Sequence, residues 1–427
     1  MSDNSLHAEW RLDDAAAQPY DARMATIAIL GTMDSKGEEH AFVAEQILKR
    51  GHQILVIDVG TLGEAKLKPD LTRDEVLATV GIKISDLLAK KDRGESVAAM
   101  SKAAPIILSR LQAEKKIDGV ISLGGGGGTA IGTAAMRALP IGFPKVMVST
   151  LASGNTAQYV GVKDIVMFPS IVDVAGLNRI SREILTRAAG AICGMVESQP
   201  QLSADKPIIV ASMFGNTTDC VQGAKKILEQ AGYEVLVFHA TGIGGRTMES
   251  LIESGMVAGV LDITTTEWAD EFVGGFLTAG PTRLEAAARQ GIPAIVTPGC
   301  LDMVNFYGPE SVPAKFAGRN FYQHNPQVTL MRTTPEECGQ LGKILAEKIN
   351  LSIGRVTVLI PLKAISIISA EGQKFHDPLA DKSLFDNLKT NLRRDIEVIQ
   401  LDCKINDAIF AEKCAEVLLR HIKPGTS

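Results

Sequence analysis

The sequence predicts an α/β protein with two Rossmann-like parallel-sheet domains that are related by an internal repeat. Residues 26–60 and 207–242 follow one plan: an apolar run, a polar turn with glycine, a helical pattern, and a second apolar run. In each stretch the second apolar run begins after a glycine, Gly51 or Gly232. Such a succession of strand, helix and strand is a βαβ unit, which favours a parallel sheet.

The repeat continues beyond these two units. Residues 119–129 parallel residues 259–267, and residues 141–155 parallel residues 290–305. Each domain therefore places polar loops after the carboxyl ends of its strands, where open parallel sheets bind their ligands. Two such domains in succession predict a cleft between them that takes a small-molecule ligand.

Composition excludes several classes of protein. A chain of 427 residues with 45% hydrophobic content can bury two cores. The net charge of −5 argues against nucleic-acid binding, because neutralising phosphates needs a basic surface. No apolar run is long enough for a membrane span and no signal-peptide pattern is visible, so we expect a cytoplasmic protein without a membrane partner.

Six cysteines are scattered along the chain without a C-x-x-C pair or a metal-binding spacing. This pattern is typical of reduced and mostly buried thiols. Cys300 stands out because it lies in an expected strand-end loop, where a nucleophile could work.

The first domain is expected over residues 25–199, after a polar N-terminal extension, 1–24, that lacks any period. Helical patterns at 106–116 and 129–139 alternate with its strands. The polar segment 198–207, which holds two prolines, is the expected linker. The expected strands are 26–31, 52–59, 118–123, 145–150 and 164–168.

The second domain is expected over residues 200–427. Its expected strands are 207–212, 233–239, 258–263, 293–298, 355–361 and 395–401, and its later helices are 334–350, 383–392 and 407–421. Residues 305–332 show little helical or strand period. We expect this stretch to be a loop that covers the cleft, because long loops inside compact domains are usually functional.

A run of five glycines after an expected strand is the strongest local signal. Glycines leave the backbone N–H groups uncovered, and the positive end of the following helix points to the same place, which suits a phosphate or carboxylate. The alternatives are a flexible loop or a tight packing contact. The spacing matches neither a P-loop nor a dinucleotide fingerprint, so a hydride enzyme is poorly supported. The predicted anion-binding residues are Gly124, Gly125, Gly126, Gly127, Gly128 and Thr129.

Two more strand-end loops of the first domain carry polar groups. In residues 31–37, Thr32 and the early amides suit an anion, Lys36 adds a positive charge, and Asp34 suits a hydroxyl or a hydrated Mg²⁺. The alternative for Asp34 and Ser35 is a helix N-cap, since glutamates follow three or four residues later. A third loop supplies neutral hydrogen-bonding groups for an oxygen-rich ligand, at Ser153, Gly154 and Asn155.

The second domain suggests different chemistry at its strand ends. His239 precedes a glycine turn at 242–245, and Glu267 follows a run of threonines. A histidine with nearby carboxylates suits acid/base catalysis or a divalent ion, so His239, Glu267 and Asp34 are the candidate catalytic residues. The alternative for His239 is an ordinary loop histidine whose hydrogen bonds are satisfied.

Several of these strings occur together in a known family. The motifs GTMDSKGEE, SLGGGGGT, STLASGNT, FHATGIGG, DITTTE, LDMVNF and HNPQVTLMRTT resemble those of an uncharacterised bacterial and fungal family. That family is related to the ATP-binding N-terminal domain of the tobamovirus-resistance protein of tomato. The resemblance covers nearly the whole chain after the first couple of dozen residues.

The resemblance implies a cytoplasmic homodimer that binds ATP or a related nucleotide, with Mg²⁺ as an accompanying ion. On that basis the glycine run, Thr32, Asp34 and Lys36 would hold the phosphates, with Ser153 and Asn155 beside them. SLGGGGGT also resembles the G-G-D-G-[ST] loop of phosphofructokinase-like and NAD kinases. Gly127 replaces the acidic residue of that loop, which speaks against a kinase unless Asp34 or Glu267 substitutes for it.

Two functions remain open from the sequence. One is an enzyme that acts on a small oxygenated or phosphorylated metabolite in the interdomain cleft. The other is a non-catalytic, ATP-dependent regulatory or protein-interaction module. Polar residues at the strand ends of both domains favour the enzyme, whereas the lack of a recognisable nucleophile or metal cluster favours the module.

Overall fold

The computed structural model describes residues 24–198 and 206–422, which pack into two compact units. Unit 1 holds residues 24–139, 143–160 and 165–198, and unit 2 holds residues 206–422 with the short segments 140–142 and 161–164. The N-terminal extension and most of the linker expected from the sequence lie outside the described residues.

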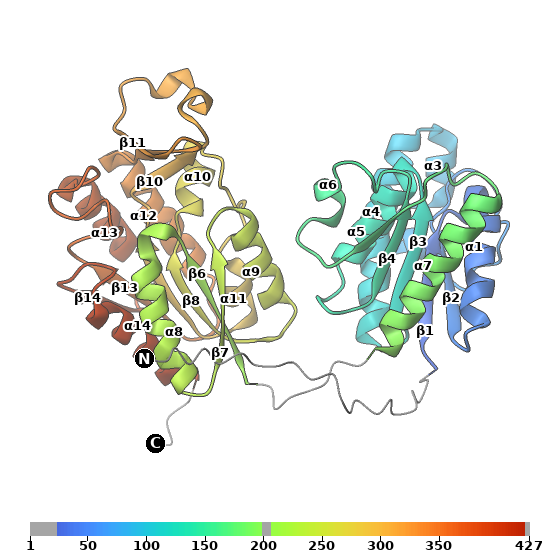
Figure 1. Cartoon of the computed structure of the whole chain (residues 1–427), viewed down its shortest axis with the longest axis horizontal. Coiled ribbons are helices and arrows are strands. Elements are labelled where there is room, and N and C mark those ends of the chain that lie inside the picture. The colour runs from blue at the N-terminus through green and yellow to red at the C-terminus, as the bar shows by residue number, and fades with distance from the viewer. Residues whose placement is uncertain (1–23, 199–205, 423–427) are drawn as a thin grey trace, which may run out of the picture. The chain divides into compact units, whose positions relative to one another are not determined.

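Unit 1 is built on a five-stranded parallel sheet with the strand order β2-β1-β3-β4-β5 (Figure 1). Its first and third strands, which neighbour each other, are mostly apolar and buried along nearly their whole length, as is typical of parallel strands covered on both faces. The strands are β1 (Thr26–Gly31), β2 (Gln53–Asp58), β3 (Gly119–Gly124), β4 (Lys145–Ser149) and β5 (Val166–Pro169).

Helices cover both faces of this sheet. Alternate residues of β1 enter two different cores: Ile27 and Ile29 pack with α1 and α7, whereas Ala28 and Leu30 pack with α2, α4 and α5. The helices of unit 1 are α1 (Met33–Leu48), α2 (Arg73–Ala78), α3 (Ile84–Lys90), α4 (Arg93–Ala113), α5 (Gly126–Arg137), α6 (Ala157–Val160) and α7 (Arg179–Glu197).

Unit 2 repeats this plan around a six-stranded parallel sheet with the order β14-β13-β9-β8-β6-β7. Its strands are β6 (Ile208–Met213), β7 (Glu234–His239), β8 (Val257–Thr264), β9 (Ala294–Gly299), β13 (Val356–Pro361) and β14 (Glu397–Leu401). Its helices are α8 (Thr218–Gln230), α9 (Ile243–Glu253), α10 (Glu267–Val273), α11 (Glu285–Gln290), α12 (Pro335–Ile349), α13 (Pro378–Asn391) and α14 (Ala408–Ile422).

The two sheets confirm the predicted fold class of two parallel-sheet α/β domains. In both, the second strand pairs with the outer side of the first, and the third strand pairs with its inner side. The chain therefore repeats one topology, as the sequence repeat predicted.

The prediction of a structureless covering loop at residues 305–332 is wrong. These residues form most of a three-stranded antiparallel sheet, β10-β12-β11, with two short 3₁₀ turns at Pro309–Ser311 and Ala314–Phe316. The strands are β10 (Met303–Phe306), β11 (Phe321–Asn325) and β12 (Val328–Arg332). They are too short to establish a clear alternation, and the outer strand β11 is half exposed, so its composition looks like that of a loop.

Within the described part of the chain, no helix combines the length and the apolar character needed to cross a bilayer.

Candidate functional site

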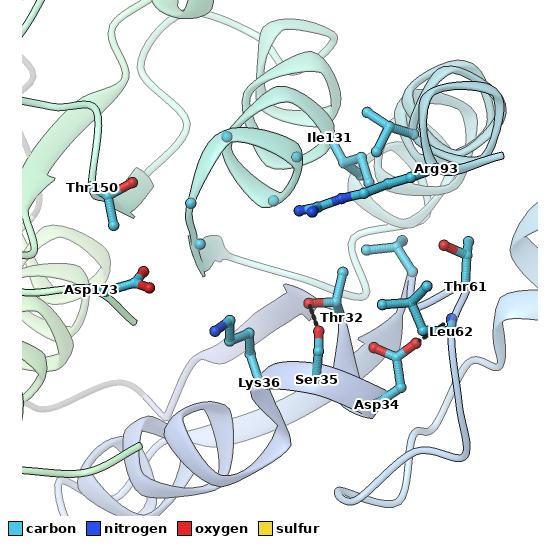
Figure 2. Close-up of a pocket in the computed structure, with 17 residues that line it drawn as sticks. Thr32, Asp34, Ser35, Lys36, Thr61, Leu62, Arg93, Ile131, Thr150 and Asp173 are labelled. Atoms are coloured by element: carbon cyan, nitrogen blue, oxygen red, sulfur yellow. Dashed lines mark hydrogen bonds between the residues drawn. The ribbon is translucent and has the colours of Figure 1, made fainter. Parts of the chain in front are cut away.

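A cavity of about 340 Å³ opens at the carboxyl end of the unit 1 sheet, and we call it the glycine-loop cavity (Figure 2). It lies where β1 and β3 are neighbours but lead into helices on opposite faces, α1 and α5. Such a switch point leaves a crevice between the two outgoing loops. The lining residues are Thr32, Asp34, Ser35, Lys36, Val59, Thr61, Leu62, Arg93, Val97, Gly124, Gly125, Gly126, Gly127, Gly128, Ile131, Thr150 and Asp173.

The glycine run, which we call the glycine loop, spans the end of β3 and the start of α5. Gly125 is the N-cap residue, and α5 begins at Gly126, three residues earlier than the helix expected from the sequence. No side chain caps this end, and its first turn holds no acidic residue. Because the first N–H groups of a helix have no partner within the helix, they leave a positive end at the cavity.

Glycine occurs at different positions of this run for different physical reasons. A Cβ on Gly124 would lie 2.8 Å from the Cα of Gly128, and a Cβ on Gly127 would lie 3.3 Å from Cγ2 of Val97. A Cβ on Gly126 would meet open space. Packing therefore accounts for glycine at position 124, whereas nothing in the fold itself requires glycine at position 126.

Two cationic side chains lie beside the glycines. Arg93 is the first residue of α4, and its guanidinium Nη2 lies 3.8 Å from the Cβ position of Gly127. Lys36 faces the same loop from α1 (Figure 2). The backbone of α1 leaves helical geometry at Lys36, with φ −126° and ψ 21°, and the Lys36 carbonyl lies 2.7 Å from Nδ1 of the buried His40.

Asp34 joins the first turn of α1 to the loop after β2. Its Oδ2 accepts hydrogen bonds from the N–H groups of Leu62, at 2.7 Å, and Gly63, at 3.2 Å. Its Oδ1 is buried without a hydrogen-bond partner among the described residues, although the side chain belongs to the cavity wall. A buried acceptor without a partner is unfavourable, so it is a natural place for a donor from a ligand.

The N-cap alternative for Asp34 and Ser35 is wrong. The N-cap residue of α1 is Thr32, which makes no side-chain capping bond, and both other residues lie inside the first turn. The Ser35 hydroxyl donates to Oγ1 of Thr32 at 2.9 Å.

The remaining predicted residues of unit 1 take different places. Thr129 is fully buried behind the glycine loop, where its hydroxyl lies 2.7 Å from that of Ser149. Ser153 lines a neighbouring cavity of about 310 Å³, and Asn155 accepts a hydrogen bond from the N–H of Ala157 at 3.1 Å. Gly154 follows Ser153 in the same loop and lines neither of these two cavities.

The structure thus brings Thr32, Asp34 and Lys36 to one cavity with Gly124–Gly128. Sequence reasoning missed Arg93 and Asp173. Arg93 stands in a charged segment that looks like an ordinary solvated surface. Asp173 follows an expected strand by a few residues, so the rule that ligands bind at strand ends could have found it.

Glu267 belongs to a buried ion-pair cluster in unit 2. It is 1% exposed, and its carboxylate accepts from the N–H of Gly242 at 2.8 Å, the N–H of Gly245 at 3.0 Å and Nε of Arg283 at 2.7 Å. Burial raises the pKa of Glu267, and the Arg283 guanidinium opposes that rise. These contacts give Glu267 a structural role in closing the glycine turn.

His239 is exposed to solvent, unlike the residues of this buried cluster. It is the last residue of β7 and its side chain is exposed, whereas Glu267 faces inward. Among the described residues, no hydrogen bond joins His239 to Glu267, the pair that the sequence suggested for acid/base catalysis.

Two other chemical predictions can be placed. The Cys300 thiol is fully buried, and burial raises its pKa well above the ordinary range, which disfavours a nucleophilic thiolate. Among the residues that the structure describes, no three His, Cys, Asp or Glu side chains gather in a way that could hold a metal ion.

Both halves of the chain match family models. Residues 25–201 match the model described as "Uncharacterised protein family (UPF0261) N-terminal domain". Residues 206–422 match the corresponding C-terminal domain model of the same family.

Similar proteins come from bacteria and from a plant. A UPF0261 protein of Clostridium tetani is 53% identical over 92% of this chain and 98% of its own length. A UPF0261 protein of Rhizobium meliloti is 47% identical over 91% of this chain and 97% of its own length. The tomato ToMV resistance protein Tm-1(GCR237) is 39% identical over 91% of this chain, which spans 55% of that longer protein.

Two solved structures illustrate a distant similarity. A UDP-N-acetylglucosamine 2-epimerase is 12% identical, with a TM-score of 0.23 over 93% of this chain and 96% of that one. The enzyme from Neisseria meningitidis is 11% identical, with a TM-score of 0.22 over 93% of this chain and 100% of its own. Likenesses this weak carry no argument about ligand or reaction.

Proposed function

The chain belongs to the UPF0261 family, and we propose that it binds a phosphate-bearing ligand, ATP or a related nucleotide, in the glycine-loop cavity of unit 1. The uncapped start of α5 carries this proposal. Its first N–H groups have no helical partner, and glycines leave them open to the cavity. A helix N-terminus of this kind suits a phosphate group.

Charge supports the same ligand. Lys36 and Arg93 line the cavity, and Arg93 lies next to Gly127. A guanidinium offers paired donors to phosphate oxygens, and an ammonium adds a point charge. Together with the positive end of α5, Arg93 and Lys36 favour an anion beside the glycines, in a cavity whose wall also holds the carboxylates of Asp34 and Asp173.

An acceptor at the cavity wall supports a ligand that also carries donors. The Oδ1 atom of Asp34 lacks a hydrogen-bond partner among the described residues. A hydroxyl, an amino group or a metal-bound water of the ligand would satisfy it. Inorganic phosphate at neutral pH offers few such donors, whereas a nucleotide offers several.

The cavity also suits Mg²⁺ that arrives with the phosphates. Protein sites for Mg²⁺ in nucleotide-binding proteins commonly use one or two carboxylates, with phosphates and waters as the other ligands. Asp34 and Asp173 are the carboxylates in the wall of this cavity. When bound, the ion would neutralise phosphate charge, and Asp34 would hold its waters.

The size of the cavity is compatible with this ligand class. Its volume of about 340 Å³ falls within the range of roughly 300–1,000 Å³ that is typical of small-molecule sites. The homodimer and the cytoplasmic location that the family resemblance implies stay part of the proposal, and light scattering on the purified chain tests the dimer.

Titration calorimetry with ATP, with and without Mg²⁺, tests the proposal. We expect saturable binding by the wild-type chain and none by Gly126→Val. An ATP hydrolysis assay on the same sample separates an enzyme from the non-catalytic module, because only an enzyme would release phosphate.

A further inference from the structure

We infer that a second cavity beside the glycine loop binds the hydroxyl groups of the ligand's sugar part. This cavity, here the hydroxyl pocket, has a volume of about 310 Å³ and is lined by residues 170–173 with Ser149, Thr150 and Ser153. The inference rests on the proposed function, because it assigns a second part of the same ligand. It identifies the ligand class as a phosphorylated sugar or a nucleotide.

The two cavities adjoin each other. Thr150 and Asp173 line both of them. Figure 2 shows these two side chains on the opposite side of the glycine loop from Arg93. A ligand whose phosphate lies on the glycines can therefore reach the hydroxyl pocket with the group next to its phosphate.

The polar side chains of the hydroxyl pocket divide into two groups. Two hydroxyls are used within the fold: Ser149 Oγ lies 2.7 Å from Thr129 Oγ1, and Ser170 Oγ donates to the Val172 carbonyl at 2.6 Å. Thr150 and Ser153 are exposed residues, and their hydroxyls make no hydrogen bond to the described part of the chain. They are left for a ligand.

Asp173 determines which ligand group suits the pocket. Asp173 is exposed, and its carboxylate forms no hydrogen bond or ion pair with the described residues. No Lys or Arg lines the hydroxyl pocket. A second phosphate would therefore be repelled here, whereas sugar hydroxyls would donate to the carboxylate and exchange hydrogen bonds with Thr150 and Ser153.

The backbone beside Asp173 adopts a costly conformation. The N–H of Val172 donates to the carbonyl of Ser170 at 2.7 Å, and Ile171 between them has φ +65°. This is a γ-turn of the rare kind, with a β-branched residue in the left-handed region. The side chain of Ile171 is 71% exposed, so burial does not offset the strain. Strain of this kind is often found at ligand sites, and here the turn holds Asp173 at the pocket.

The test compares ligands with and without sugar hydroxyls. Calorimetry measures the affinity of the wild-type chain and of Asp173→Asn for inorganic triphosphate, ATP and 2′,3′-dideoxy-ATP, and for inorganic phosphate and glucose 6-phosphate. Asp86→Asn, on the exposed surface of α3, removes the same charge at a position that lines neither cavity. Each titration is repeated without Mg²⁺.

We expect Asp173→Asn to lower the affinity for ATP and glucose 6-phosphate roughly tenfold or more, because each loses a hydrogen bond to a charged group. Binding of inorganic triphosphate and dideoxy-ATP should stay the same or become tighter, because a negative charge is removed. Asp86→Asn should behave as wild type with every ligand.

Three outcomes would overturn the inference. In the first, wild-type protein binds triphosphate but binds ATP no more tightly than dideoxy-ATP, and glucose 6-phosphate no more tightly than phosphate. This result would contradict the hydroxyl pocket but not the proposed phosphate site. In the second, Asp173→Asn weakens all ligands equally and only with Mg²⁺, which makes Asp173 a metal-binding residue. In the third, no phosphate compound binds to the wild-type chain, and the proposed function fails as well.

Discussion

The carboxylate of Asp34 accepts a hydrogen bond of 2.7 Å from the N–H of Leu62, and this bond joins the first turn of α1 to the loop after β2. Both residues line the glycine-loop cavity. One oxygen of Asp34 therefore holds the wall of the cavity, and the other, which has no hydrogen-bond partner among the described residues, is left for the proposed ligand.

Asp34→Ala should lower the free energy of unfolding of unit 1 by about 1–3 kcal/mol, because the N–H groups of Leu62 and Gly63 lose their acceptor. It should also weaken ATP binding. Urea unfolding followed by circular dichroism measures the first effect, and calorimetry the second. Asp34→Asn keeps one acceptor oxygen and should retain most of the stability. Equal losses for both variants would contradict the hydrogen-bonding role.

Gly124→Ala and Gly126→Ala should separate folding from binding within one glycine run. The first places a methyl 2.8 Å from the Cα of Gly128 and should cost about 1–3 kcal/mol of stability. The second meets open space in the first turn of α5 and should leave the stability unchanged or slightly raised. The unfolding temperatures of the two variants, compared with that of the wild-type chain, test both expectations. A destabilised Gly126→Ala would mean that the loop itself requires glycine there.

Removing Arg283 should destabilise unit 2 by about 3–5 kcal/mol, because it would leave buried carboxylates unpaired. Arg283 is fully buried and contacts Asp262, at 2.7 Å, and Glu249, at 3.0 Å, in addition to Glu267. Fluorescence of the buried Trp268 follows unfolding of Arg283→Met. A substitution at the exposed Arg289 is the matched control. Stability near that of wild type would contradict the structural role of the cluster.

The free energy of unfolding of unit 2 should fall as the pH rises from about 4 to about 8, because of the raised pKa of Asp270 in the folded chain. Burial raises the pKa of Asp270 to about 8, although Asn305 donates two hydrogen bonds to it. An unfolded aspartate titrates near pH 4, so the folded chain holds a proton across this window that the unfolded chain releases. The contribution of protonated Asp270 to the free energy of unfolding is complete below pH 4. It falls by about 1.4 kcal/mol per pH unit between pH 4 and pH 8, and it is lost above pH 8.

Asp270→Asn cannot titrate and isolates this effect. The difference in unfolding free energy between the variant and the wild-type chain, measured in urea at pH 5, 6, 7 and 8, should shift steadily in favour of the variant. A difference that stays constant over this range would show that Asp270 is ionised in the folded chain.

Much of the site could be predicted because it depends on topology. Gly124–Gly128 and the segment Thr32–Lys36 both follow strands that a doubly wound sheet places side by side, and apolar runs mark those strands clearly. The start of α5 inside the glycine run was missed, because glycine has a low helix propensity and the positive end of the helix, rather than its interior, tolerates it.

The rest depends on contacts between segments that are distant in sequence. Arg93 reaches the glycines because α4 packs beside α5, and nothing in its own segment signals this. Glu267 looks like a catalytic residue among polar neighbours until Arg283 is seen to pair with it. The strands within 303–332 were missed because three short strands, one of them half exposed, do not show a usable period.

Titration of wild-type protein and Gly126→Val with ATP tests the central claim most directly. We expect saturable binding to the wild-type chain. We expect Gly126→Val to unfold at the same temperature but to give no binding heat, because valine would occupy the space at the open helix end. Equal binding of ATP by the two proteins, or no binding of any phosphorylated ligand by the wild-type chain, would contradict it.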